Sequence, residues 1–149
     1  MNALFEAKSN RAMVERLQHL KSDAQPVWGR MNVRQMLAHC RQPLLVATGQ
    51  KKLKRGLIGI LFGKLAKKKL AGPKPFERGL PTAPDFVVRD PKPFSEEHAE
   101  LIALVQRFAD EGPSVLSNDP HPFFGPLTSA EWDLLQWKHL DHHLRQFGT

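Results

Sequence analysis

The chain has 149 residues, enough for one domain with a single hydrophobic core and too few for two comfortable ones. Hydrophobic residues make up 41% of it and charged residues 25%, a balance that excludes the disordered and fibrous classes of protein. The net charge of +7 comes from residues 51–78, which hold ten basic residues and one acid. We therefore expect one domain over residues 1–149, with the basicity confined to one segment.

The predicted elements begin with an amphipathic helix at about residues 8–21, where apolar residues recur at helical spacing. A second helix is predicted over residues 32–48. Asn32 is a favoured N-cap residue, and Gln35 three residues later completes a capping box. Gly49 is the expected stop of this helix, because glycine readily adopts the left-handed conformation that ends helices.

A long connection follows the second helix. Residues 56–72 are compatible with a short helix that is cationic on one side. Six prolines lie between residues 73 and 93, and proline interrupts helices. The sequence therefore predicts a basic and proline-rich connection that ends in an ordered wrap or loop without helix.

Two further helices are predicted after the connection. The first has Ser95 as its cap and ends at Gly112. The last opens with a capping box formed by Thr128 and Glu131 and runs nearly to Gly148. No convincing alternation of strand type is present, so the four long helical patterns predict an all-α fold, a four-helix bundle.

Two histidines lie one turn apart on the last predicted helix. At about 100° per residue, His139 and His143 are roughly 40° apart, close enough for both imidazoles to reach one metal ion. Trp132 and Gln146 share their face, whereas His142 falls near the polar edge and is expected beside the site or at the surface. A pair of hydrogen-bonded core histidines explains this spacing equally well, so a metal site needs a third ligand.

His39 is the candidate third ligand, because it lies at the edge of the apolar face of the second helix. Cys40 points about 100° away from it and is expected to be a small core residue. His121, in the loop HPFFG, either reaches the mouth of the pocket or orders its turn. Bulky aromatic residues in bundles usually pack the core, and this is expected of Trp28 and Trp137, with a place in the wall of a pocket as the alternative. Trp132 shares the histidine face and is therefore the expected pocket residue.

Three segments of the chain resemble the DinB/YfiT-like superfamily of metalloenzymes: WGRMNVRQMLAHC, HPFFGPLTSAEW and WKHLDHHLRQFG. The resemblance extends over nearly the whole chain and is closer to a bacterial branch of unknown function. It implies a four-helix bundle that holds a divalent metal through one histidine of the second helix and an H-x-x-x-H pair of the last, often followed by a glutamine. The matching residues are His39, His139 and His143, with Gln146 at the glutamine.

Characterised members of the superfamily include metal-dependent transferases that use thiols such as bacillithiol or mycothiol. The resemblance therefore implies a metal-dependent enzyme, either a thiol S-transferase or a hydrolase, that acts on a small-molecule substrate such as an anionic thiol. Three neutral imidazoles leave an open position where a metal turns water or a thiol into a nucleophile. Zn²⁺, Ni²⁺, Fe²⁺ and Mn²⁺ all accept such ligands. The catalytic residues, and assembly into a homodimer, stay open.

The alternative is a non-catalytic binding protein whose basic segment, residues 51–78, engages an anionic partner. A solvated surface and an anion-binding lip over the active site are the other interpretations of this segment. It lacks the interleaved aromatic residues that stack on bases, so nucleic acid is disfavoured. The apolar run LIGILF is too short to span a membrane. A single cysteine and the lack of a secretory signal pattern lead us to expect a cytoplasmic protein.

Overall fold

The computed structural model describes residues 3–54, 67 and 74–149. These residues form four α-helices and no β-strand: α1 (Ala7–His19), α2 (Val33–Ala47), α4 (Phe94–Glu111) and α5 (Ser129–Gln146). The all-α prediction is confirmed for this part of the chain. The short helix expected at residues 56–72 lies, apart from Lys67, outside the described residues. None of the described helices has the length and apolar character needed to cross a bilayer.

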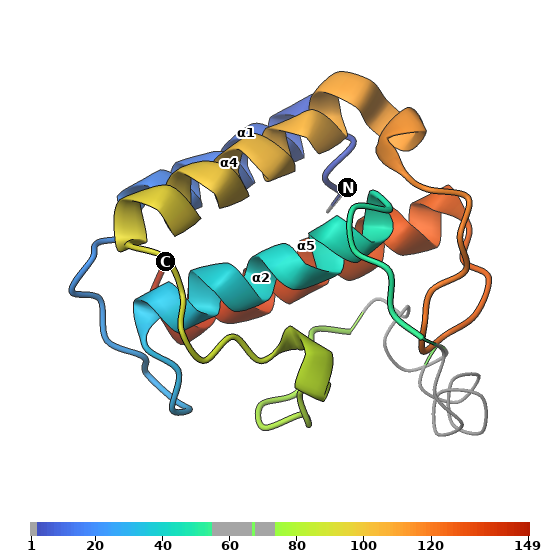
Figure 1. The fold of residues 1–149 in the computed structure, drawn as a ribbon. Helices are drawn as coiled ribbons and strands as arrows, with labels where there is room; N and C mark the ends of the chain where they lie inside the picture. Colours follow the sequence, from blue (N-terminus) through green and yellow to red (C-terminus); the bar gives the residue numbers. More distant parts are fainter. Residues whose placement is uncertain (1–2, 55–66, 68–73) are drawn as a thin grey trace.

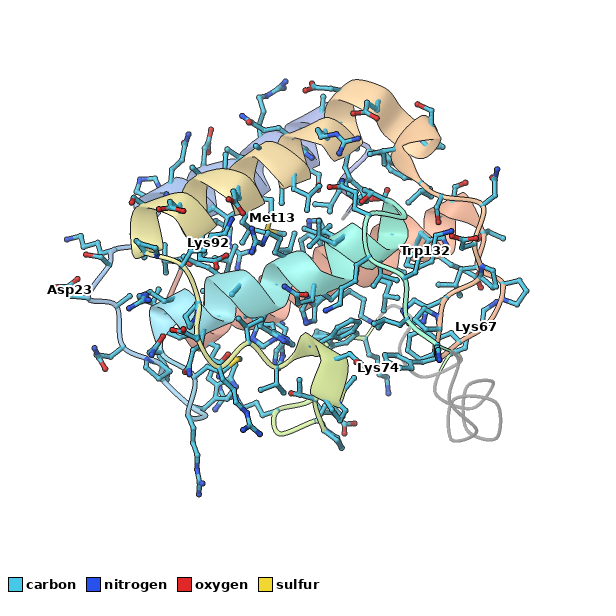
Figure 2. All side chains as sticks on the ribbon, in the orientation of Figure 1. Met13, Asp23, Lys67, Lys74, Lys92 and Trp132 are labelled. Atoms are coloured by element: carbon cyan, nitrogen blue, oxygen red, sulfur yellow. The ribbon has the colours of Figure 1, made fainter. Side chains whose placement is uncertain are left out.

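The four helices form two layers around one core. Helices α1 and α4 lie side by side in one layer, and α2 and α5 in the other (Figure 1). Met13 of α1 points into the space between the layers, where it is 1% exposed (Figure 2). Large apolar side chains from all four helices fill the rest of this core, among them Leu17, Met36, Leu37, Leu44, Leu101, Phe108, Leu140 and Leu144. Each such burial stabilises the fold by about 1.5–3 kcal/mol.

Both predicted capping boxes are present. At the start of α2, Asn32 Oδ1 accepts a hydrogen bond from the Gln35 N–H (2.9 Å), and Gln35 Oε1 accepts one from the Asn32 N–H (3.0 Å). Thr128 and Glu131 make the same exchange at the start of α5, at 3.2 and 2.8 Å. These two helices carry the candidate ligands, and the caps define where each of the two helices begins.

The prediction that Ser95 caps the third main helix is wrong. Helix α4 begins at Phe94, and the residue at the cap position is Pro93. The carbonyl of Pro93 accepts hydrogen bonds from the N–H groups of Glu96 and Glu97. The fixed φ of proline suits a position next to a helix start, so the backbone begins the helix without a side-chain cap.

Residues 74–93, which we call the strap, run along the outer side of the α2–α5 layer and then rise to the start of α4 (Figure 1). The strap was expected to contain no helix, but it includes one short 3-10 turn, η1 (Pro84–Phe86). Proline at the first position of this turn supplies the required φ, and the turn buries Phe86. Two side chains tie the strap down: Arg34 Nη2 donates to the Pro91 carbonyl (2.6 Å), and Lys51 Nζ donates to the Asp85 carbonyl (2.7 Å).

Candidate metal centre

Three histidines from two helices meet on the side of the α2–α5 layer that faces the strap. The ring centroids of His39, His139 and His143 lie 4.7 to 4.8 Å from one another. One ring nitrogen of each lies within 4.8 Å of the other two, and the Nε2 atoms of His39 and His139 are 2.9 Å apart. Nitrogens that bind one tetrahedral Zn²⁺ lie roughly 3.3 Å apart. The His39–His139 separation is slightly shorter than that value, and the other two lie within 4.8 Å.

Hydrogen bonds at Nδ1 determine where two of these rings carry their proton. His39 Nδ1 lies 3.0 Å from the carbonyl oxygen of Phe86, which can only accept. His143 Nδ1 lies 2.8 Å from Oε1 of Gln146, and the Gln146 amide is oriented by its own donation to the Trp28 carbonyl (2.7 Å). Both rings must therefore donate through Nδ1, which leaves a lone pair on each Nε2.

These two rings have the form in which histidine binds divalent metals. Metal-bound imidazoles usually donate their other N–H to a carbonyl or carboxylate oxygen, which orients the ring. The Nε2 of His139 faces the lone pair of His39 Nε2, so in the metal-free protein His139 must supply a proton between them. A divalent cation would replace that proton, so the donor set fits a metal ion.

Burial keeps all three rings neutral. It is the main cause that lowers the pKa of His39, against a smaller opposing effect of the Phe86 carbonyl. Burial, followed by the nearby His143 and His39, lowers the pKa of His139 well below its usual value. The pKa of His143 falls to about 3, again mainly through burial. Since the neutral imidazole is the ligand form, these shifts favour metal binding at neutral pH.

His142 lies beside this cluster and is not part of it. Its ring centroid is 5.0 Å from that of His143, 6.1 Å from that of Phe76 and 5.8 Å from that of Trp28. The ring is half-buried among these neighbours. It therefore forms part of the aromatic surroundings of the three histidines, as expected from its place at the edge of the helix face.

The histidine cluster opens into a cavity of about 880 Å³. Its walls come from α2, α5, the strap, residues 28–31 and residues 121–124. A volume of this size accommodates a small organic molecule. The cavity lies under the strap, on the outer face of the α2–α5 layer, so the site is separate from the apolar core between the two layers.

Two aromatic residues lie elsewhere than expected. Trp132 is not among the residues that line the cavity; it is buried behind the ring of His121, with 5.0 Å between ring centroids. Trp28 was expected in the core, but it lines the cavity from the loop before α2. Helical phase gives the face of α5 on which Trp132 lies but not whether its ring reaches the cavity. Helical phase says nothing about a loop residue such as Trp28.

Both alternatives considered for His121 are realised. Its ring lines the cavity, and its Nδ1 accepts hydrogen bonds from the N–H groups of Phe123 (3.0 Å) and Phe124 (3.3 Å). The sequence pattern led to no prediction for two other lining residues, Gln136 and Phe76. Gln136 lies about 60° from His139 by helical phase, so a signal for it existed. Phe76 belongs to the strap, where no periodicity applies.

Cys40, next to His39 in the sequence, faces away from the cluster. Its side chain is buried, with Sγ 3.6 Å from the sulfur of Met36. Burial raises the pKa of this thiol, so it stays protonated and is a poor ligand and nucleophile. Cys40 is a small core residue, as its position on the helix predicted.

Comparison with known proteins identifies the family of the chain. A family model described as "Protein of unknown function (DUF1569)" matches residues 4–149. No curated protein and no solved structure gives a significant match. The family match spans all four described helices and the three histidines, and the chain therefore belongs to the DUF1569 family.

Proposed function

We propose that the protein is a divalent-metal-dependent enzyme in which His39, His139 and His143 hold the ion. The observation that carries this proposal is that three imidazoles from two helices bring one ring nitrogen each within 4.8 Å of one another, while Nδ1 of His39 and of His143 is engaged elsewhere. A hydrogen bond between His39 and His139 accounts for two of these rings, and His143 is the third ligand that a metal site needs. We further propose that the four helices are a DinB-like bundle, since one histidine comes from the second helix and an H-x-x-x-H pair from the last.

The proposed reaction is thiol S-transfer or hydrolysis of a small molecule. A divalent ion held by three imidazoles lowers the pKa of a water or thiol at its open position. The protein orients two of the rings through the Phe86 carbonyl and Gln146, and the cavity beside them has room for a substrate. Arg30 and Arg89 line the same cavity, which supports an anionic substrate such as an acidic thiol. The ligand set is compatible with Zn²⁺, Ni²⁺, Fe²⁺ or Mn²⁺.

Metal analysis of the purified protein tests this proposal. Protein prepared without chelator is expected to carry about one divalent ion per chain. His39→Ala, His139→Ala and His143→Ala should each abolish retention of the ion. His142→Ala is the matched control, a histidine on the same helix outside the cluster, and it should weaken binding by about 10- to 100-fold at most.

Two results would contradict the proposal. One is protein without bound metal that takes up neither Zn²⁺ nor Ni²⁺ when these are added. The other is loss of the ion in His142→Ala with retention in His143→Ala. The reaction class is tested by measuring thiol consumption and ester hydrolysis with the metal-loaded and the stripped protein, and the proposal expects turnover only in the loaded form.

The alternative of a non-catalytic binding protein draws no support from the described part of residues 51–78. Several of its basic side chains contact other parts of this chain. Lys52 pairs with Asp119 (3.5 Å), Lys67 pairs with Glu131 (3.0 Å), and the Arg78 guanidinium lies 4.0 Å from the Trp28 ring centroid. Lys67 and Arg78 are held against the chain in this way, whereas Lys52 stays largely exposed.

A further inference from the structure

Gln136 of α5 has a buried side-chain nitrogen without a hydrogen-bond partner among the described residues. The residue is 1% exposed, and its Nε2 makes no hydrogen bond within the described part of the chain. It also lines the cavity beside the histidine cluster. A buried amide without a hydrogen bond is unfavourable, and such groups in native proteins usually have a partner. Rotation of the amide turns either its nitrogen or its oxygen toward the cavity.

His121 brings a second hydrogen-bond donor to the same cavity. Its Nδ1 accepts two backbone N–H groups, so the proton of the neutral ring is on Nε2. Burial lowers the pKa of His121 to about 3, which keeps the ring neutral. Among the described residues, hydrogen bonds to this ring reach Nδ1 alone. The Nε2–H group is therefore available to a ligand.

The two groups lie along the same stretch of α5 as the histidine cluster. The ring of His121 packs on Trp132, one turn before Gln136, and His139 follows Gln136 by three residues. Gln136, His121 and the three histidines therefore line one cavity, and Gln136 and the Trp132 contact of His121 lie within two turns of His139 on α5.

The rest of the cavity lining favours an apolar anion. Aromatic side chains form much of it, namely Trp28, Phe76, Phe86, Phe123 and Phe124. Two exposed arginines, Arg30 and Arg89, line it as well, and no aspartate or glutamate is among its described lining residues. Apolar walls combined with arginine and neutral donors match a molecule with an aromatic or aliphatic body and a negatively charged acceptor group.

We propose that Gln136 and His121 form a subsite that binds the carboxylate of an apolar substrate and holds that substrate beside the three histidines. The inference rests on the proposed function for its biological meaning, because it names the substrate class of that site. The hydrogen bonds themselves do not involve a metal, so the subsite is tested separately from metal binding.

Phenylacetate is a suitable probe, with benzylamine as a comparison of similar shape and opposite charge. Binding is measured by calorimetry, and by the NMR signal of the His121 Nε2–H group, on chelator-stripped protein, where a carboxylate has no metal to bind. Phenylacetate should bind the native chain, and benzylamine should bind at least tenfold more weakly. Gln136→Met, which removes the amide and keeps the length, should weaken phenylacetate binding by about 10- to 100-fold, the usual effect of losing a hydrogen bond to a charged group.

Gln42→Met is the matched control. Gln42 is another buried glutamine, but it lies outside the cavity and has partners, the Ala38 carbonyl (3.0 Å) and Lys51 Nζ (2.6 Å). Its replacement should lower the melting temperature and leave phenylacetate binding unchanged. Gln136→Met should instead raise the melting temperature by about 2–6 °C, because it removes an unpaired buried amide.

Three outcomes would overturn the inference: no binding of phenylacetate to the native chain, equal binding of phenylacetate and benzylamine, or unchanged phenylacetate binding in Gln136→Met. Metal content is measured on every variant. Gln136→Met should keep its metal. If the native chain binds metal but not phenylacetate, the subsite is wrong and the metal site stands. If it binds phenylacetate but no metal, the metal site is wrong and the subsite stands.

Discussion

Replacing Gln146 by methionine removes an amide that makes two hydrogen bonds in the candidate metal centre. Its Oε1 accepts from His143 Nδ1 (2.8 Å), and its Nε2 donates to the Trp28 carbonyl (2.7 Å). Methionine keeps the length and apolar volume of the side chain. Gln146→Met therefore leaves the His143 N–H and the Trp28 carbonyl without their partner while changing little else.

The structure indicates the size of both effects. Each buried polar group left unsatisfied costs about 1–3 kcal/mol, and Trp28 is partly exposed, so the free energy of unfolding should fall by about 2–4 kcal/mol. The His143 ring also loses the acceptor that orients it and sets its tautomer. Loss of such a partner reduces metal affinity by about 10- to 100-fold.

Urea unfolding measures the first effect, and competitive Zn²⁺ titration against a chelating dye measures the second. Gln42→Met is again the control, because this buried glutamine also loses two hydrogen bonds, neither of them to a candidate ligand. It should lose stability and keep its Zn²⁺ affinity. If Gln146→Met binds Zn²⁺ as tightly as the native chain, Gln146 does not orient His143 and the tautomer argument fails.

Three further predictions concern the surroundings of the site. Gly29→Ala should lower the free energy of unfolding by about 1–3 kcal/mol more than Gly79→Ala does. Both glycines have a φ above +70°, but a Cβ at Gly29 would lie 2.5 Å from Gln146 Nε2, whereas a Cβ at Gly79 would have no atom within 4 Å. Urea unfolding of the two variants checks this, and equal losses would show that the close approach is relieved. His121→Asn should flatten the pH dependence of stability. In the native chain the unfolded ring takes up a proton near pH 6.5, whereas the folded ring does so only near its pKa of about 3. The stability of the native chain is therefore fully present above pH 6.5 and falls by about 1.4 kcal/mol per pH unit as the pH drops from 6.5 toward 3. Asparagine keeps an acceptor near the position of Nδ1, and an unchanged slope in denaturation curves from pH 6 to pH 4 would argue against a neutral buried ring. Cys40 should react with iodoacetamide only as fast as the chain unfolds, because its thiol is buried and its pKa is raised; rapid labelling of the folded protein, followed by mass spectrometry, would contradict this burial.

Several features of the fold were predictable because they depend on interactions within a few residues. The capping boxes at Asn32 and Thr128 involve residues three positions apart. The burial of His143 and of Cys40 follows from 3.6 residues per turn and the apolar pattern. The start of α4 was predicted less well, because the backbone of Pro93 begins that helix in place of a serine side chain.

The tertiary structure decided everything that depends on residues far apart in the sequence. The Nε2 atoms of His39 and His139 are 2.9 Å apart although 100 residues separate them. Periodicity shows that each histidine lies on or beside the apolar face of its own helix, but it does not show that α2 and α5 pack with the histidines together. It also does not show that the site opens toward the strap and away from the core between the layers.

The hydrogen bonds that define the chemistry of the site have the same origin. The Phe86 carbonyl that orients His39 lies 47 residues along the chain, on the strap, and the Trp28 carbonyl that orients the Gln146 amide lies 118 residues away. The sequence by itself determined which side chains are candidate ligands, because that depends on residue type and helical phase. Only the packing of the strap and the loop before α2 onto the two helices decided which ring nitrogens carry a proton, because a tautomer is set by the hydrogen-bond partner brought to it.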